Sequence, residues 1–194
     1  MFWNDERILH WASNGGIQPF DGTSIHQADP STWPGQLGGA SIDLTLSNLV
    51  AVPQLWTHLE RRKLRFGNKA DMTQIWTAPF VYEEFVLESG SSALFSTAEQ
   101  VFIPDDACAF LISRSSTGRC LIEHMHAGFG DPGFIESTWT LEVVNFSGAD
   151  WVFKPGDRVV QMVMGELTAP AKRPYWMKGR YSGQIAPTAP KGWE

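Results

Sequence analysis

Cysteines, long apolar runs and basic residues are all scarce in this chain. The two cysteines among 194 residues, Cys108 and Cys120, do not form a CxxC pair. No disulfide framework or thiolate zinc site can be argued from that spacing, so we expect reduced thiols. No apolar stretch approaches the roughly 18 residues of a membrane helix, and the N-terminal MFWNDERILHW lacks the apolar core of a signal peptide. We therefore expect a cytoplasmic protein.

The charge balance narrows the class of partner. Fifteen Lys and Arg oppose 21 Asp and Glu, which gives a net charge of -6. A protein that wraps a duplex usually carries a basic excess, so general nucleic-acid binding is disfavoured. The end of the chain is an exception, because the residues after Pro170 include only one acidic residue, Glu194, and five basic ones: Lys172, Arg173, Lys178, Arg180 and Lys191. This basic tail is either a clamp for a small anion or a solvated terminus.

The length and the hydrophobic fraction of 43% suit one soluble globular domain. We predict a single domain over residues 1–194, in which residues 170–194, rich in proline and glycine, form an irregular C-terminal arm. A short helix is predicted from Asp5 to Ala12, capped by Asn4 or Asp5 and ended by the Asn14-Gly15-Gly16 run. Residues 54–82 read as mainly irregular, with a turn or two of helix over residues 58–65.

Strand patterns dominate the rest of the chain. Short runs rich in branched and aromatic residues, separated by turn signals such as Asp131-Pro132-Gly133, predict strands at 41–46, 85–87, 93–95, 100–103, 109–112, 139–144 and 158–164. Many short strands at this spacing indicate a mainly β fold, an antiparallel sandwich or barrel with jelly-roll character.

A dense polar cluster, RSSTGR at residues 114–119, follows the strand predicted at 109–112. Its hydroxyls, guanidiniums and backbone N–H groups suit phosphate oxygens. A capping serine before a helix, or a surface loop, gives the same pattern.

Two further candidate sites follow the polar cluster. His124, His126 and Asp131 suggest a metal set, although a hairpin connection explains that segment as well. Glu142 stands inside the apolar strand predicted at 139–144, where burial should raise its pKa and suit it to shuttle protons. A glutamate at a sheet edge is the alternative.

Taken in order, seven motifs resemble the dCTP deaminase family of the dUTPase-like superfamily. They are ASIDLTL at 40–46, STAEQVFIPDD at 96–106, RSSTGR at 114–119, AGFGDPGF at 127–134, TLEVVN at 140–145, KPGDRVVQM at 154–162 and RYSGQIAPT at 180–188. The resemblance implies a dUTPase-like distorted β-barrel or jelly-roll, with a short N-terminal helix and an irregular C-terminal arm. It also implies a homotrimer with sites between neighbouring subunits.

The same resemblance assigns the chemistry. It implies deamination of dCTP to dUTP and ammonia without a metal at the reacting centre, supplying dUTP or dUMP for thymidylate synthesis. Glu142 would be the general base and proton shuttle. Ser115, Arg119 and the carbonyl of Ala127 would position the attacking water.

The resemblance also assigns substrate contacts. Asp131 would bond the sugar 3′-hydroxyl and Phe134 would lie near the deoxyribose. The triphosphate would be held by Arg114, Ser115 and Ser116, with Tyr175, Arg180 and Gln184 closing over it from the arm. Mg²⁺ would bind through the substrate triphosphate, and no zinc is expected.

The chain departs from the family pattern at several positions. Thr45 stands where the family has Arg. Arg180 replaces the usual Lys of the arm, and Lys178 is the alternative residue for that role. Gly130 replaces a branched residue before Asp131. The 119–127 loop is one residue short, and the 131–142 stretch is one residue long.

Three other functions remain open from the sequence. A zinc-dependent deaminase would need a PCxxC segment after its HxE, and only His58-Leu59-Glu60 is present. A dUTPase, or a bifunctional enzyme that forms dUMP, would use the same fold with Asp131 as the base. A nucleotide-sensing or protein-binding relative would have lost turnover. Four of the nine tryptophans, Trp56, Trp76, Trp139 and Trp151, suggest base stacking. Strand packing explains Trp139 and anchoring of a loop to the core explains the others, so none is assigned to the site.

Overall fold

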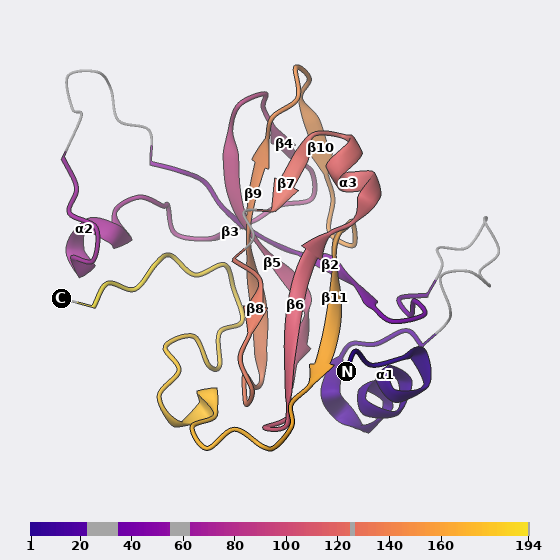
Figure 1. Ribbon diagram of the computed structural model, residues 1–194. Coiled ribbons are helices and arrows are strands. Elements are labelled where there is room, and N and C mark those ends of the chain that lie inside the picture. Colours follow the sequence, from indigo (N-terminus) through magenta and orange to yellow (C-terminus); the bar gives the residue numbers. More distant parts are fainter. Residues whose placement is uncertain (23–34, 55–62, 125–126, 194) are drawn as a thin grey trace.

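The computed structural model describes residues 1–22, 35–54, 63–124 and 127–193. The N-terminal helix α1, Asp5–Trp11, starts where predicted, because the Asn4 side chain accepts a hydrogen bond from the Arg7 backbone N–H. The chain continues into one wide turn over Ala12–Gly16, where Gly15 takes a φ of 87° and ends the helix. The termini, α1 and the sheet are shown in Figure 1.

The molecule is mainly β, as the turn and strand patterns predict. The strands are β1 (Ile17–Gln18), β2 (Ile42–Ala51), β3 (Phe80–Val81), β4 (Phe85–Leu87), β5 (Ser92–Val101), β6 (Ala107–Ser113), β7 (Ile122–His124), β8 (Phe129–Gly130), β9 (Ser137–Asn145), β10 (Trp151–Phe153) and β11 (Arg158–Glu166). Two short helices, α2 (Lys69–Thr73) and α3 (Ser115–Arg119), and a 3-10 turn at Tyr175–Met177 complete the elements.

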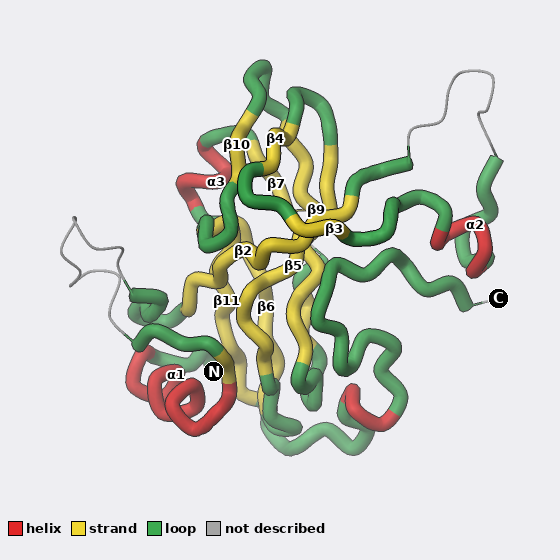
Figure 2. The backbone as a smooth tube through the Cα atoms, turned by 180° about the vertical axis from the view of Figure 1, so that it is seen from behind, coloured by secondary structure: helices red, strands yellow, loops and turns green. Residues whose placement is uncertain are grey.

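One antiparallel sheet organises these strands, in the order β7-β9-β5-β2-β11-β6-β8, with β1 added to β5 and β3 added to β2. Strands β10 and β4 form a separate two-stranded sheet. The tube in Figure 2 shows the strands of the large sheet running side by side, with loops and the arm beside them. None of the helices in the described part of the chain is long and apolar enough to cross a membrane.

The prediction of two separate strands at 93–95 and 100–103 is wrong, because both runs belong largely to the single strand β5. A register shift against β9 between Ser96 and Gln100 marks a bulge inside this strand. The Thr97 side chain stabilises the strand at the bulge through two hydrogen bonds. Its hydroxyl accepts the Trp139 N–H at 2.9 Å and donates to the Glu99 carbonyl at 2.8 Å, in place of regular ladder bonds.

Segment 54–82 is mainly irregular in its described part, as predicted. It holds α2, the two-residue strand β3 and Trp76, which forms an isolated bridge with Pro53 just before the segment. Of the helical turns predicted over 58–65, residues 58–62 lie outside the described residues and residues 63–65 are not helical.

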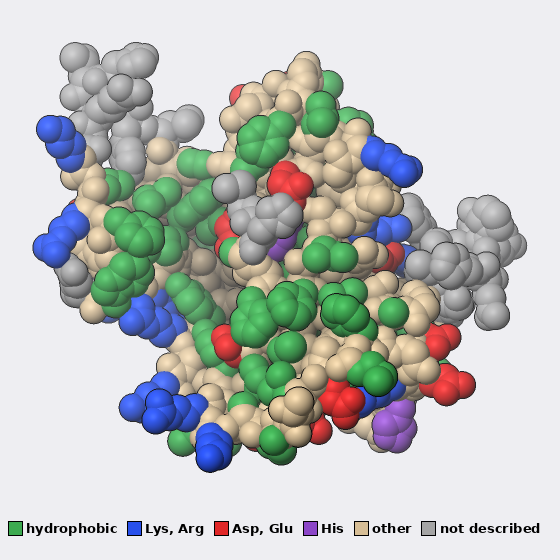
Figure 3. Space-filling model, in the orientation of Figure 1, with side chains coloured by type: hydrophobic (Ala, Val, Ile, Leu, Met, Phe, Trp, Pro, Cys, Tyr) green, Lys and Arg blue, Asp and Glu red, His purple; other side chains and the backbone are tan. Residues whose placement is uncertain are grey.

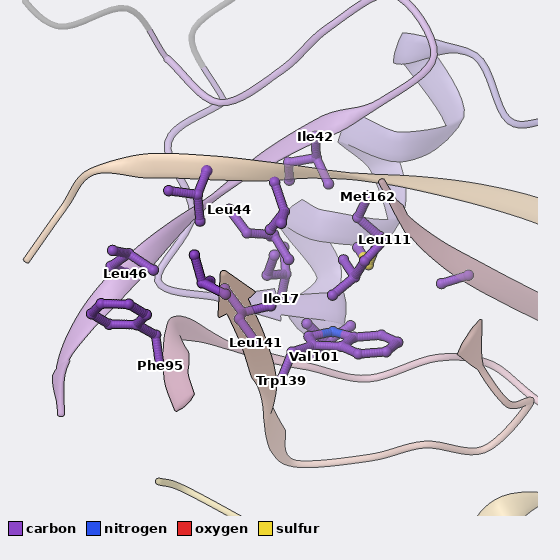
Figure 4. Packing of buried hydrophobic residues seen from close by; sticks show 14 of the residues in the cluster. Ile17, Ile42, Leu44, Leu46, Phe95, Val101, Leu111, Trp139, Leu141 and Met162 are labelled. Carbon is purple, nitrogen blue, oxygen red and sulfur yellow. The ribbon is translucent and has the colours of Figure 1, made fainter. Parts of the chain in front are cut away.

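The core lies between the curled strands of the large sheet. Buried side chains from β2, β5, β9 and β11 meet there, among them Leu44, Phe95, Leu141 and Met162, none of which is exposed to solvent (Figure 4). Burying this apolar surface is the main favourable contribution to the fold. It also fixes the faces of β5 and β9, and so the direction in which their polar side chains point.

Candidate active site

A cavity of about 400 Å³ opens between β9, the turn after β8 and the C-terminal arm. Six residues assigned from the sequence line it: Ala127, Asp131, Phe134, Glu142, Tyr175 and Gln184. They come from four separate parts of the chain, so the fold brings together groups that are up to 57 positions apart, from Ala127 to Gln184.

Glu142 supplies the carboxylate of this cavity. It lies in the middle of β9, opposite Leu94 of β5, and its side chain is 35% exposed. One carboxylate oxygen, Oε2, lies 3.6 Å from Nε2 of His124, a residue of the neighbouring β7 whose side chain is 2% exposed. Burial raises the pKa of Glu142 above its ordinary value. The cavity therefore contains a carboxyl group that keeps its proton to a higher pH than an ordinary glutamate does.

The turn after β8 places the second acid of the cavity. The Phe134 backbone N–H donates to the Asp131 carbonyl at 3.1 Å, and Gly133 between them takes a φ of 79°. The Phe134 ring packs 5.1 Å from the Trp139 ring and 5.5 Å from the Tyr175 ring. Burial raises the pKa of Asp131 as well. An aromatic surface thus adjoins a carboxylate in this part of the cavity.

The arm is held against β9 by polar contacts. The Gln184 side-chain amide donates to the Thr138 carbonyl at 2.7 Å, and the Thr138 N–H donates to the Gln184 carbonyl at 2.9 Å. The Tyr181 N–H donates to the Tyr175 hydroxyl at 3.1 Å. These bonds place three arm side chains, those of Tyr175, Tyr181 and Gln184, in the lining of the cavity.

The other five assigned residues lie elsewhere within one chain: among the described residues that line the cavity, none is Arg114, Ser115, Ser116, Arg119 or Arg180. Arg114 forms an ion pair of 3.1 Å with Asp43, a side chain only 3% exposed. Arg180 donates to the carbonyls of Lys191 and Gly192 in the arm itself. Helix α3, which carries the two serines and Arg119, lies on the opposite side of the central strands from the arm (Figures 1 and 2).

Two tryptophans line the cavity, although the sequence interpretation assigned none to the site. Trp139 lies in β9 opposite the bulge of β5, where its backbone N–H donates to the Thr97 hydroxyl, and its ring packs beside that of Phe134. Trp76 comes from the segment that matches the family motifs least. The sequence does not distinguish Trp76 from a loop tryptophan that anchors to the core, because its place in the cavity depends on a bridge to Pro53 rather than on a local pattern.

Thr45, the first departure from the family pattern, lies in a buried polar cluster and does not line the cavity. Its backbone N–H and its hydroxyl donate to the Glu99 carboxylate at 3.0 and 2.7 Å. Gln36 donates to the same carboxylate at 2.6 Å. Neutral donors therefore satisfy Glu99, although burial still raises its pKa.

Gly130, another departure, has no room for a side chain. A Cβ there would lie 2.5 Å from Ile103 Cδ1 and 2.6 Å from Trp139 Cη2. We expect Gly130→Val to lower the free energy of unfolding by about 1–3 kcal/mol in urea titrations, because overpacking forces neighbours off their preferred positions. Gly148→Ala is the matched control, since nothing lies within 4 Å of its Cβ position. Equal stability of the Gly130→Val variant and the wild type would show that the site adapts freely.

Within the described ranges, no group of three or more His, Cys, Asp and Glu side chains is arranged to hold a metal ion. The set of His124, His126 and Asp131 considered from the sequence includes His126, which lies outside the described residues, as do His58 and Glu60.

Comparisons with known proteins agree on one family. The family model described as dCTP deaminase-like matches residues 13–167. A dCTP deaminase of Haloarcula marismortui is 32% identical over 199 residues, covering 98% of this chain and 94% of the relative. A "dCTP deaminase, dUMP-forming" of Mycobacterium tuberculosis is 34% identical over 202 residues, covering 100% and 97%.

A solved structure supports the fold. The 2′-deoxycytidine 5′-triphosphate deaminase from Agrobacterium tumefaciens superposes with a TM-score of 0.61 at 18% identity. The match covers 84% of this chain, which spans slightly less than half of that longer one, 46%. The expected dUTPase-like β fold with its short N-terminal helix is confirmed. On the match to the family model and the full-length relatives, this chain belongs to the dCTP deaminase-like family.

Proposed function

We propose that this protein hydrolyses the C4 amino group of dCTP, giving dUTP and ammonia. The observation that carries the proposal is Glu142, a carboxyl group of raised pKa in the wall of a cavity. The names of the full-length relatives from Haloarcula and Mycobacterium support the same substrate.

Glu142 is the proton shuttle in this mechanism. Its carboxylate takes a proton from water as the water oxygen attacks C4, and it delivers that proton to N3 of the ring. It then transfers the proton of the new hydroxyl to the departing amine, so that one water and dCTP become dUTP and ammonia. A carboxylate of raised pKa is a stronger base than an ordinary one, which suits a reaction whose nucleophile is not activated by a metal.

Three groups are proposed to orient the water for that attack. They are the Ser115 hydroxyl, the Arg119 guanidinium and the carbonyl of Ala127, of which Ala127 lines the cavity. Holding the water near C4 lowers the entropic cost of the attack. The positive charge of Arg119 would also favour the ionised carboxylate.

The nucleotide is proposed to lie along the cavity. Asp131 would bond the 3′-hydroxyl and Phe134 would pack on the deoxyribose, both in the lining. The triphosphate would contact Arg114, Ser115, Ser116, Tyr175, Arg180 and Gln184. Mg²⁺ fits the nucleotide rather than the protein, because the described residues offer it no cluster of acidic ligands. When bound, it would offset phosphate charge.

A homotrimer with shared sites would bring α3 to the cavity. Ser115 and Arg119 do not line the cavity of their own chain, so a neighbouring subunit would supply them. The outer face of β6 and β8 exposes Phe110 (39%), Ile112 (39%) and Phe129 (52%), and Figure 3 shows hydrophobic side chains gathered over these strands. An apolar patch of this kind is typical of an interface between protein chains.

As the pH is lowered, the deamination rate is expected to fall at a higher pH than it would with an ordinary glutamate as the base. The base must be ionised, and burial raises the pKa of Glu142 above its ordinary value of 4.5. The rate therefore falls as the pH drops through the raised pKa. Measurement of kcat between about pH 4.5 and 8 would show this limb. Far-UV circular dichroism at each pH separates it from unfolding, and a constant kcat down to the lowest pH would contradict the role of Glu142.

The direct test incubates the purified protein with dCTP and Mg²⁺, separates dCTP, dUTP and dUMP, and measures ammonia. Equal amounts of dUTP and ammonia are expected. If dCTP survives while added dUTP is hydrolysed, the protein is a dUTPase. If neither nucleotide changes, the deaminase proposal is wrong, and a binding role or another cytosine nucleotide becomes the better explanation.

Formation of dUMP is the second candidate function. Asp131 lies in the same cavity with a raised pKa, which suits a base that activates water for attack on phosphorus. The Mycobacterium relative is named as dUMP-forming. In the same assay, dUMP would then appear together with ammonia.

A further inference from the structure

Trp76 is fixed in the wall of the cavity by backbone bonds on both sides. The Gln54 N–H donates to the Ile75 carbonyl at 2.7 Å, and the Thr77 N–H donates to the Val52 carbonyl at 2.9 Å. A β-bridge joins Pro53 to Trp76 between these two bonds. The indole is partly buried and shares the lining with Glu142. The segment after β2 thus delivers a large flat side chain to the cavity that holds the proposed base.

The end of the arm closes against the same segment. The Trp193 N–H donates to the Gly67 carbonyl at 2.9 Å, and the rings of Trp193 and Phe66 meet edge to face at 5.1 Å. Closer to the cavity, the Thr188 N–H donates to the Thr140 hydroxyl of β9 at 3.1 Å. These contacts tie the segment that carries Trp76 to the arm and to the strand that carries Glu142.

The aromatic groups of the cavity differ in their surroundings. Phe134 packs with Trp139 and Tyr175, in the part of the cavity beside Asp131. Trp76 belongs to none of the described aromatic pairs, and it reaches the cavity from a different segment of the chain than the Phe134 cluster. A pyrimidine whose C4 approaches Glu142 presents a π-face that a flat apolar side chain covers well.

We propose that Trp76 packs against the pyrimidine ring of dCTP and so strengthens binding of the base in the cavity that holds the Glu142 carboxylate. This inference rests on the proposed function, since it concerns the base of the same nucleotide. It makes Trp76 a determinant of substrate affinity that comes from outside the family motifs. Its contact is with the base and leaves the triphosphate untouched.

Trp76→Leu and Trp76→Phe separate stacking from simple filling of space. Leucine keeps an apolar side chain without a flat face, whereas phenylalanine keeps the flat face. We expect Trp76→Leu to raise KM for dCTP about 10-fold, with kcat within about 3-fold of the wild type, and Trp76→Phe to stay within about 3-fold in both. Trp151→Leu is the matched control, because Trp151 lies in β10, is 36% exposed and does not line the cavity.

Binding measurements keep the test independent of turnover. In calorimetry, Trp76→Leu is expected to weaken dCTP binding about 10-fold while the affinity for inorganic tripolyphosphate stays within about 2-fold. An equal loss for both ligands would show that Trp76 only supports the fold or the arm, and an unchanged KM for dCTP would also overturn the proposal. Should the wild type fail to deaminate dCTP, the proposed function fails, and the two affinities still decide whether Trp76 contacts a base. Should Trp76→Leu not fold, the Trp76→Phe variant decides: a 10-fold rise in KM there contradicts stacking.

Discussion

Glu142→Gln is expected to lower the rate of dCTP deamination by at least about 10³-fold. Glutamine keeps the size and shape of the side chain on β9, but its amide cannot accept the proton of the attacking water at neutral pH. The same group would deliver protons to N3 and to the amine, so one substitution interrupts each proton transfer. Steady-state release of ammonia from dCTP measures the loss.

The same substitution should leave the protein at least as stable as the wild type. Burial raises the folded-state pKa of Glu142, so folding disfavours its ionised form. This cost to stability is fully present above the raised pKa, shrinks as the pH falls through it, and is absent below the ordinary pKa. Glutamine removes the cost, so thermal unfolding at pH 7 should occur at an equal or higher temperature. Glu83→Gln, at an exposed position, is the matched control for both measurements. Deamination within about 10-fold of the wild type would exclude Glu142 as the base.

Two inactive variants should restore activity when they assemble together. Arg119→Ala is expected to lose at least about 100-fold in rate, because the orienting cation is removed from the site. If neighbouring subunits share each site, a chain with Arg119→Ala still offers an intact cavity, and a chain with Glu142→Gln still offers an intact α3. A trimer that contains both variants has one complete site out of three, so about a third of wild-type activity should return in the mixed trimers.

Co-expression with two different affinity tags, followed by purification over both, isolates the mixed oligomers for this test. Mass measurement in solution gives the number of subunits. A mixture of Arg119→Ala with Ser115→Ala is the control, because both changes lie on α3 and no complete site can form. If the Arg119→Ala and Glu142→Gln mixture stays inactive although mixed trimers are present, each site is contained within one chain.

Local patterns in the sequence predicted the elements that carry the site. The sequence predicted β4 at its observed bounds, Asn4 or Asp5 as the cap of α1, of which Asn4 is the cap observed, and Glu142 as a carboxylate inside an apolar strand. Each depends on neighbours within a few positions, where period and turn chemistry are informative. The turn at Asp131 was equally readable, since its proline and glycine define it.

Contacts between distant segments could not be read in this way. The bulge of β5 depends on Thr97 meeting Trp139, 42 positions away. The place of Trp76 in the cavity depends on a bridge to Pro53, just after β2, and that of Thr188 on a hydrogen bond to Thr140. Helix α3 is the opposite case. Its sequence motif predicts residues of the site, but these residues do not line the cavity within one chain.

Gly130 and Trp139 constrain each other's identity. The family pattern has a branched residue where Gly130 stands, and a Cβ at that position would meet the Trp139 ring at 2.6 Å. The side chain tolerated at position 130 therefore depends on the side chain at position 139, because the two compete for the same space. The two positions form an energetically coupled pair, and the effects of substitutions at them are not expected to add independently.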